Sequence, residues 1–383
     1  MKRFDVAIVG AGPAGCSAAI FLARKGYSVA LIERSLFPRE KLCGDFLNPV
    51  NWEIFEKLGI ENALLSSAHE KVGSFRISTA SATAKIPFPP QNGRHFFGVG
   101  LRRSLLDDLL LRLAEKEGVA VKQGCKPSHF SRDKNDWVLI WKDSCAESKL
   151  YSRLLIGADG RNSWVAHRLG LAAPTARSGK FVAFQLHLSG CGGINGNVQI
   201  HLFPGGYGGL VGLGGGVATL CFIIDKKMAR AMPAVEDLVK KYLCRNSRLE
   251  EALEAGKAVG AERSVYPVYF SPRRCFGDGF LLAGDAACVT EPVTGEGVYF
   301  ALKSGELAAE AADLAFRRGD VSARQLFGYE SACHRVFGRR LRINALIRAI
   351  IHRPYLIVPL LNLYPKNNLP IRTLVNLVCR AGS

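Results

Sequence analysis

The chain has 383 residues, 48% of them hydrophobic, which predicts two to three globular domains with sizeable cores and excludes a disordered chain. Its net charge of +18 favours anionic membrane surfaces, nucleic acids or acidic ligands as partners, although we predict no specific nucleic acid, and a merely basic cytoplasmic protein is the alternative. Eleven cysteines without a C-x-x-C pair exclude a disulfide framework and a zinc or iron-sulfur site. We therefore expect reduced thiols, a cytoplasmic location and no metal.

Residues 4 to 33 change from a buried-strand pattern to an amphipathic helix and back, which predicts a strand-helix-strand unit in a parallel sheet. Its glycines have the G-x-G-x-x-G spacing of a tight turn that approaches a pyrophosphate closely. The helix start supplies amide donors to phosphates. An acid that ends the second strand can accept ribose hydroxyls and disfavours a 2′-phosphate, so FAD or NAD is favoured over NADP. The predicted nucleotide-binding residues are Gly10, Gly12, Pro13, Ala14, Gly15, Glu33 and Arg34.

The middle of the chain has two different sequence patterns. Residues 101 to 117 have helical apolar spacing, 119 to 121 and 137 to 141 resemble short strands, and 154 to 170 predict a strand, a tight turn and a helix start. Between about 171 and 265, alternating and glycine-broken runs predict an antiparallel sheet. This sheet is expected to form a second domain inserted into the first.

Residues 280 to 302 predict an apolar strand that runs into Gly284-Asp285 and then a Pro/Gly-rich loop that opens a helix near Gly297. After residue 330 the chain becomes both cationic and apolar. Its apolar stretch from Pro354 to Tyr364 is too short for a bilayer span and is interrupted by proline. Two interpretations stay open for this region: a surface helix whose arginines face lipid headgroups, or a helix that covers the core with solvated arginines outside.

Three motifs together resemble the FAD-dependent oxidoreductases of the p-hydroxybenzoate hydroxylase type and, within them, the geranylgeranyl reductase family. They are the glycine turn with its acid, the Gly157-Ala158-Asp159-Gly160-Arg161 stretch, and Gly284-Asp285. The resemblance covers residues 1 to about 310. It implies an α/β fold with a Rossmann-like FAD-binding domain of the glutathione reductase type, an inserted antiparallel β-sheet substrate domain and a C-terminal helical region.

The expected domain boundaries follow from this resemblance. The discontinuous FAD-binding domain comprises 1–70, 95–170 and 266–330, and the substrate domain comprises 71–94 and 171–265. The basic, apolar cap comprises 331–383.

The resemblance also extends the cofactor site. The Asp285 carboxylate is expected on the ribityl or pyrophosphate part of FAD, and backbone amides from the loop before Gly297, with the helix dipole behind them, would stabilise a reduced flavin. An arginine at a helix start is expected against FAD, with a surface salt bridge as the alternative. The residues so implied are Cys43, Gly44, Arg103, Asp159, Gly160, Gly284, Asp285, Pro292, Gly295, Glu296 and Gly297.

Cys43 is the candidate catalytic residue, because geranylgeranyl reductases carry a cysteine followed by glycine beside the flavin. It would donate a proton to a reduced double bond or shape the pocket wall, and a purely structural cysteine is the alternative. Lys41 or Arg39 is expected to lower its pKa. Lys41, Tyr207 and Gly209 are the candidate substrate residues.

The chain departs from the family where the substrate should be recognised. Geranylgeranyl reductases tend to carry Tyr-x-Trp-x-Phe-Pro, whereas this chain has Tyr207-Gly208-Gly209-Leu210-Val211-Gly212. The lost aromatic bulk predicts a wider or reshaped cavity. The glycines alternatively mark only bends in a strand.

The expected function is flavin-mediated reduction of carbon–carbon double bonds in a hydrophobic, lipid or isoprenoid-like substrate, at the inner face of the cell membrane. The alternatives are a monooxygenase of an aromatic or polyketide-like substrate, a flavin halogenase, disfavoured because no Trp-x-Trp-x-x-Pro stretch appears, and a non-catalytic electron relay. No second glycine motif for a pyridine nucleotide occurs in a strand-helix context. NAD(P)H or a reduced electron carrier is therefore expected as a transient donor. The sequence predicts no oligomeric state.

Overall fold

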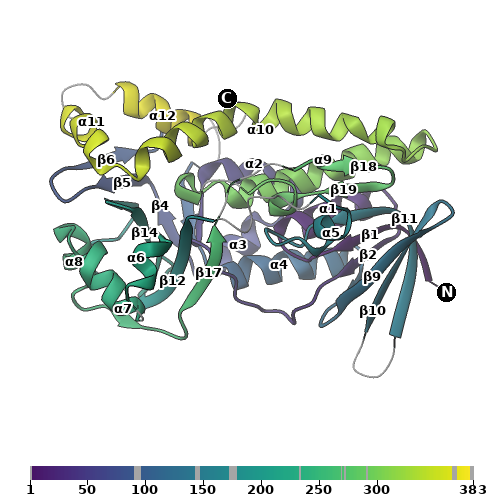
Figure 1. Ribbon diagram of the computed structural model, residues 1–383, viewed down its shortest axis with the longest axis horizontal. Coiled ribbons are helices and arrows are strands. Elements are labelled where there is room, and N and C mark those ends of the chain that lie inside the picture. Colours follow the sequence, from purple (N-terminus) through teal and green to yellow (C-terminus); the bar gives the residue numbers. More distant parts are fainter. Residues whose placement is uncertain are drawn as a thin grey trace.

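The computed structural model describes residues 2–89, 96–142, 147–171, 179–232, 234–268, 270, 273–289, 292–364 and 369–379. It confirms the predicted α/β class, with a dinucleotide-type layer, a second sheet and a helical C-terminal layer (Figure 1). No single described helix is long and apolar enough to cross a membrane.

The first layer is a sheet in the order β18-β19-β11-β1-β2-β8. Its centre is the apolar strand β1 (Lys2–Val9), which pairs in parallel with β2 (Val29–Ile32) on one side and β11 (Glu147–Gly157) on the other. Around it lie β8 (Ala120–Lys122), β18 (Phe276–Gly277) and β19 (Phe280–Leu282). The antiparallel strands β9 (Lys126–Asp133) and β10 (Asp136–Lys142) extend this sheet from β11.

Helices cover the first sheet because their apolar faces pack on it. Helix α1 (Pro13–Arg24) is almost wholly buried and packs against α9 (Gly297–Arg317), α4 (Arg103–Lys116) and β2. The Ser17 hydroxyl donates to the carbonyl of Leu302 at 2.7 Å, which fixes α1 to α9. The shorter elements of this part are η1 (Pro49–Asn51), α2 (Trp52–Leu58), α3 (Glu61–Ser66), α5 (Trp164–Arg168), η4 (Gly284–Ala286) and η5 (Pro292–Thr294).

The second sheet has the order β16-β12-β15-β14-β13-β5-β6, with β17 on β12. Its strands are β5 (Ser74–Ser78), β6 (Thr83–Pro87), β12 (Phe181–Ser189), β13 (Asn197–Phe203), β14 (Gly206–Gly212), β15 (Val217–Asp225), β16 (Lys257–Ala258) and β17 (Arg263–Val268). The pairings among β12 to β17 are antiparallel, as the sequence predicted, whereas β5 pairs in parallel with β13. The reason is that β5 belongs to a separate segment, which joins the sheet without a hairpin connection.

Two apolar clusters lie on the two faces of the second sheet. The outer face packs on α6 (Lys226–Arg230), α7 (Val235–Leu238), the π-helical turn η3 (Val239–Leu243) and α8 (Ser247–Leu253). The inner face packs on the C-terminal helices. A small third sheet of β3 (Phe46–Leu47), β7 (Gly98–Gly100) and β4 (Glu70–Val72) lies at the junction of the domains.

The C-terminal layer begins with the long helix α10 (Ala323–Ile351), which runs along one side of the molecule past α9 and β18 (Figure 1). After a short η6 turn (Pro354–Leu356), helices α11 (Val358–Leu363) and α12 (Leu369–Cys379) both contact β6. Ile351, Leu361 and Val375 belong to the same apolar cluster as the inner face of the second sheet. These helices therefore do cover a core, as one of the two interpretations predicted.

Candidate active site

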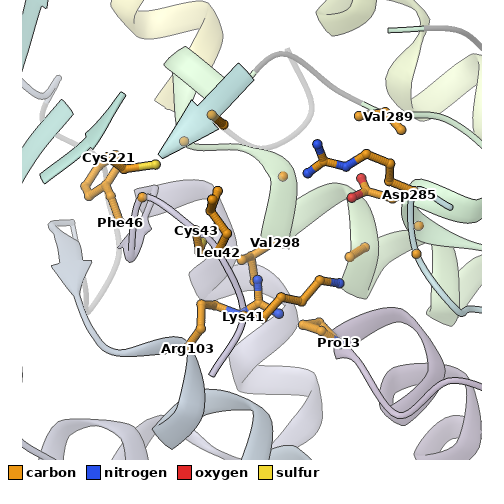
Figure 2. A pocket seen from close by; sticks show the side chains of 18 of the residues that line it. Pro13, Lys41, Leu42, Cys43, Phe46, Arg103, Cys221, Asp285, Val289 and Val298 are labelled. Atoms are coloured by element: carbon orange, nitrogen blue, oxygen red, sulfur yellow. The ribbon is translucent and has the colours of Figure 1, made fainter. Parts of the chain in front are cut away.

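One large cavity opens where the first layer, the second sheet and the loop after β2 meet, with about 1490 Å³ of empty space including its open mouth. Figure 2 shows Asp285 on one side, Cys221 and Phe46 on the other, and the loop that carries Cys43 between them. The sequence-predicted residues that line this cavity are Gly12, Pro13, Ala14, Lys41, Cys43, Gly44, Arg103, Gly160, Tyr207, Gly209, Gly284, Asp285, Gly295 and Gly297. Segments from most of the chain thus converge on one space.

The glycine turn between β1 and α1 has the close packing that its spacing predicts. Gly10 has φ +101°, and a Cβ added there would lie 2.5 Å from the carbonyl oxygen of Ala158. A Cβ on Gly15 would collide with the carbonyl oxygen of Gly10. Gly12 instead lines the cavity, with Pro13 directly after it at the start of α1. Two glycines therefore allow the turn to form, and the third leaves room for a ligand beside the helix start.

Glu33 and Arg34 lie at the end of β2, outside the lining of the cavity. Glu33 is buried and accepts hydrogen bonds from the backbone amides of Ala11, at 2.8 Å, and Ser35, at 2.9 Å. Its carboxylate thus also holds the glycine turn in place. Arg34 is exposed.

Asp285 follows β19 and is half-buried, with its side chain in the cavity. Among the described residues its carboxylate accepts no hydrogen bond and pairs with no cation. A carboxylate held at a strand end without a partner fits the hydroxyl groups of a ribityl chain, which would donate to it. The donor set therefore fits FAD at this position.

Lys41 and Arg103 bring two positive charges to the cavity wall, and the negatively charged Asp285 lines the same cavity (Figure 2). Lys41 has no hydrogen bond or ion pair in the part of the chain described, and burial, then the charge of Arg103, lowers its pKa. An anionic group bound beside Lys41 would stabilise its charged form and raise its pKa again. Although the sequence predicts a substrate role for Lys41, it lies among the residues expected to hold FAD.

Arg103 is buried at the start of α4 and donates to Asp107 through Nε, at 2.9 Å, and Nη2, at 3.0 Å. Arg39 reaches the same carboxylate at 3.2 Å. Burial opposes the charge on Arg103, but Asp107 outweighs it and raises the pKa of Arg103. The Arg103–Asp107 pair is therefore a buried one at the cavity wall, and the alternative of a surface salt bridge was wrong.

Cys43 lines the cavity beside Arg103, and burial, the largest influence, raises the pKa of its thiol although Arg103 acts in the opposite direction. The expectation that Lys41 or Arg39 would lower this pKa was wrong, because burial outweighs the charge effects and the cation that acts on the thiol is Arg103. Cys43 is thus a protonated thiol at neutral pH. A thiol of this kind can donate a proton but is a poor nucleophile.

A buried polar cluster that the sequence did not reveal holds the Cys43 loop against the second sheet. The Asp45 carboxylate accepts hydrogen bonds from Thr219, at 2.6 Å, Gln185, at 2.8 Å, and the backbone amide of Arg103, at 3.1 Å. His187 lies 2.9 Å from the same carboxylate. The only local signal is that Asp45 follows Gly44, because its partners come from distant strands.

Two other predicted residues lie outside the lining of the cavity, in structural positions. Asp159 accepts from the Ser163 hydroxyl, at 2.5 Å, and from the Val165 amide, at 3.1 Å, at the start of α5. Glu296 is buried at the start of α9, where it pairs with Arg340 of α10. Pro292 begins η5, and its side chain lies outside the described part of the structure.

The second sheet contributes only uncharged side chains to the cavity wall among the residues described. They include Ala183, Val198, Ile200, Tyr207, Val211, Cys221 and Ile223. Cys221 and Phe46 were missed by the sequence analysis, although Cys221 alternates with apolar neighbours in β15. The wall under the sheet, called here the apolar end of the cavity, therefore has no charged side chain of its own among the described residues. The charged lining residues, Lys41, Arg103, Arg161 and Asp285, come from the other segments.

Comparison with known proteins agrees with this geometry. Residues 3–190 match the FAD binding domain family. The chain is 30% identical to a menaquinone reductase of Mycolicibacterium smegmatis, covering 80% of this chain and 76% of the relative. It is 27% identical to digeranylgeranylglycerophospholipid reductase 2 of Methanopyrus kandleri (89% and 84%) and 26% identical to conditioned medium factor receptor 1 of Dictyostelium discoideum (91% and 71%).

Solved structures show the same fold. A flavin-dependent brominase superposes with a TM-score of 0.83 at 21% identity, over 99% of this chain and 94% of that one. A geranylgeranyl bacteriochlorophyll reductase-like protein from Thermoplasma acidophilum superposes with a TM-score of 0.76 at 22% identity, over 99% and 92%. The flavin-dependent halogenase CmlS has a TM-score of 0.78 at 24% identity, and this chain spans 63% of its length.

The chain belongs to the FAD-dependent oxidoreductases of the p-hydroxybenzoate hydroxylase type, in the group that includes menaquinone and geranylgeranyl reductases. It is an enzyme, and FAD is its cofactor. The family that the sequence motifs predicted is thereby confirmed. The halogenase structures, all below 25% identity, add the fold alone.

Proposed function

We propose that this enzyme reduces carbon–carbon double bonds in an apolar, isoprenoid-like substrate. The observation that carries the proposal is the sheet side of the cavity: among the described residues the second sheet contributes no charged side chain to the lining, and the charged lining residues, Lys41, Arg103, Arg161 and Asp285, come from other segments. An apolar wall recognises an apolar molecule and would leave a charged one without partners. The names of the menaquinone and digeranylgeranylglycerophospholipid reductase relatives support this substrate class.

Cys43 is the proposed acid. FAD, when bound and reduced, supplies a hydride to one carbon of the double bond. The other carbon then needs a proton, and the Cys43 thiol lies in the cavity with a raised pKa and is therefore protonated. The Asp45 cluster keeps its loop in place, since Gln185 accepts from the Cys43 amide at 3.4 Å and donates to Asp45.

NAD(P)H or a reduced electron carrier is the proposed electron donor. It would reach the flavin transiently, because no second nucleotide-binding glycine turn stands in a strand-helix context in the sequence. The substrate would then occupy the sheet end, under Tyr207 and Gly209.

Single-turnover kinetics test this proposal. The FAD-loaded protein is reduced without oxygen and mixed with geranylgeranyl lipids, which carry no quinone ring, or with oxygen, and the return of oxidised flavin absorbance is followed. We expect at least one isoprenoid acceptor to reoxidise the flavin faster than oxygen does. Rapid reoxidation by oxygen only when an aromatic compound is present would contradict the proposal and indicate a monooxygenase.

A further inference from the structure

The outward side of the C-terminal layer carries an unusual concentration of apolar side chains. Among the described residues, five large hydrophobic side chains between positions 346 and 363 are between 42% and 67% exposed: Leu346, Tyr355, Leu356, Leu360 and Leu363. They belong to the second half of α10, to η6 and to α11. We call this surface, with the exposed arginines that flank it, the C-terminal face.

The inward side of the same segment is apolar as well. Ile347, Ile351, Ile357 and Leu361 pack into the cluster that includes the inner face of the second sheet. A helix that only covers a core in water needs one apolar side and places polar residues on the other. Covering the core therefore does not explain the leucines on the outside.

The charges of this region have one sign. Four arginines of this region are exposed: Arg335, Arg339, Arg342 and Arg353. Spacings of three or four residues place Arg335, Arg339 and Arg342 on one side of α10, together with Leu346. The sequence has no aspartate or glutamate after Glu330. The C-terminal face thus joins exposed apolar side chains to uncompensated positive charge.

We propose that the C-terminal face docks on an anionic lipid bilayer, with its leucines and Tyr355 at the acyl boundary and its arginines at the headgroups. This combination of residues is typical of helices that lie in a membrane interface. A second copy of the chain fits less well, because two such faces would bring like charges together.

Docking fits the geometry better than spanning does. Helix α10 and the segment Pro354–Leu363 are long and apolar enough for a span only when taken together, and the chain bends by 109° between them. However, α10 also packs along α9 and β18, and Arg339 and Arg342 are exposed on its side. A segment fixed to the protein on one side and charged on the other lies on a membrane rather than through it.

Docking would also place the lipid next to the substrate end of the cavity, and this step rests on the proposed function. Ile351 and Leu361 of the C-terminal layer belong to the same apolar cluster as Ile200 and Tyr207 of the cavity wall. An apolar substrate would then pass from the bilayer to the cavity over a short path. The proposed docking does not depend on which reaction the enzyme catalyses.

Vesicle co-sedimentation of the full FAD-loaded chain tests the docking. The vesicles contain phosphatidylcholine alone or mixed with phosphatidylglycerol. One variant combines Leu346→Gln, Leu360→Gln and Leu363→Gln, and another combines Arg339→Gln, Arg342→Gln and Arg353→Gln. We expect binding to the mixed vesicles, lowered by roughly tenfold or more in either variant.

A matched control changes the same number of arginines on the second domain: Arg230→Gln, Arg245→Gln and Arg248→Gln, which are exposed at α6 to α8. It should bind as the unchanged protein does, and all variants should keep their FAD absorbance. An equal loss in this control, or full binding by the leucine variant, would overturn the proposal. Dimers that only the leucine variant abolishes, without vesicle binding, would show that a second copy covers the face.

Discussion

Cys43 shows how burial decides the chemistry of a side chain. The cation that acts on its thiol is Arg103, whereas the sequence alone predicted a pKa lowered by Lys41 or Arg39. Burial under the second sheet raises the pKa of the Cys43 thiol more than the charge of Arg103 lowers it, so the thiol keeps its proton. This state favours proton donation over nucleophilic attack.

The substitution Cys43→Ala should therefore slow alkene reduction by about 100-fold, the usual contribution of a general acid, with little change in KM. Reduction of the flavin by the donor should stay unchanged, because that step needs no proton from Cys43. Steady-state and stopped-flow kinetics measure both quantities. The matched control is Cys221→Ala, the other thiol of the cavity; equal losses in the two variants would contradict the assigned role of Cys43.

Gly209 stands where the geranylgeranyl reductase stretch has its tryptophan. It lines the cavity, and an added Cβ would meet no atom closer than 3.7 Å, so a side chain has room there. The glycine therefore leaves the cavity wall without a side chain at this point of β14. The neighbouring Gly208 would place its Cβ 3.3 Å from Leu243, which belongs to the cluster on the outer face of the sheet.

The substitution Gly209→Trp should fill the apolar end and lower kcat/KM for a long isoprenoid substrate by roughly tenfold or more, while FAD stays bound. The measurement compares long and short substrates, because a filled cavity penalises the long one more. Gly208→Ala, on the other face of the strand, is the control and should leave this ratio unchanged. Equal kcat/KM values for the tryptophan variant and the unchanged enzyme would show that substrate does not bind under β14.

Local sequence motifs predicted those site residues whose position is determined by the turn or the strand end in which they lie. Gly10, Gly12 and Asp285 belong to such motifs, and the structure places them at or beside the cavity. Asp45 and Cys221 could not be found in this way, since their place depends on the packing of the second sheet against the loop after β2. Contacts between segments more than a hundred residues apart leave no spacing pattern in the sequence.

At the scale of elements, one buried ion pair joins the C-terminal layer to the loop that precedes α9. Arg340 of α10 pairs with Glu296, and it also donates to the Val378 carbonyl of α12 at 3.1 Å. Asn344, one turn further along α10, donates to the same carboxylate at 3.4 Å. The sequence predicted Glu296 as a cofactor residue, but only the fold shows its partner on α10.

The substitution Arg340→Leu should lower the free energy of unfolding by about 3–5 kcal/mol, because it leaves a buried carboxylate unpaired. The neighbouring Arg339→Leu is a close control: Arg339 is exposed, so a change within about 0.5 kcal/mol is expected. Urea unfolding with FAD bound measures both. Similar losses in the two variants would mean that the pair contributes nothing beyond helix propensity.

His352 at the end of α10 links the C-terminal layer to the second sheet, and its ring stacks on Phe181 with 4.3 Å between ring centroids. Burial, then the nearby Lys180 and Arg348, lowers the pKa of His352 to about 4. An unfolded histidine titrates at about 6.5. The unfolded chain therefore takes up this proton first as the pH falls, and stability is lost progressively between about pH 6.5 and 4.

We expect the His352→Phe variant, which keeps an aromatic ring against Phe181, to lose less stability over this range than the unchanged protein. Unfolding midpoints at a series of pH values give the comparison. His201, whose pKa burial lowers to about 3, contributes to both proteins equally and cancels. Parallel pH profiles of the two proteins would contradict the assignment.

At the scale of the whole molecule, the fold class and the FAD-binding motifs followed from the sequence, because the strand-helix-strand unit is specified locally. The parallel pairing of β5 with β13, and the packing of α11 and α12 on β6, did not. Both depend on segments that meet only after the chain has folded around the second sheet. The same long-range packing creates the apolar end of the cavity, on which the proposed reaction depends.

The mass of the product formed in a single turnover tests the central claim most directly. The protein with reduced FAD is mixed with a geranylgeranyl substrate, which has no quinone ring to accept the hydride, in the absence of oxygen and then in its presence, and the product is identified by mass spectrometry. A reductase yields a product heavier by two hydrogens under both conditions. A product heavier by one oxygen atom, formed only with oxygen present, would contradict the account.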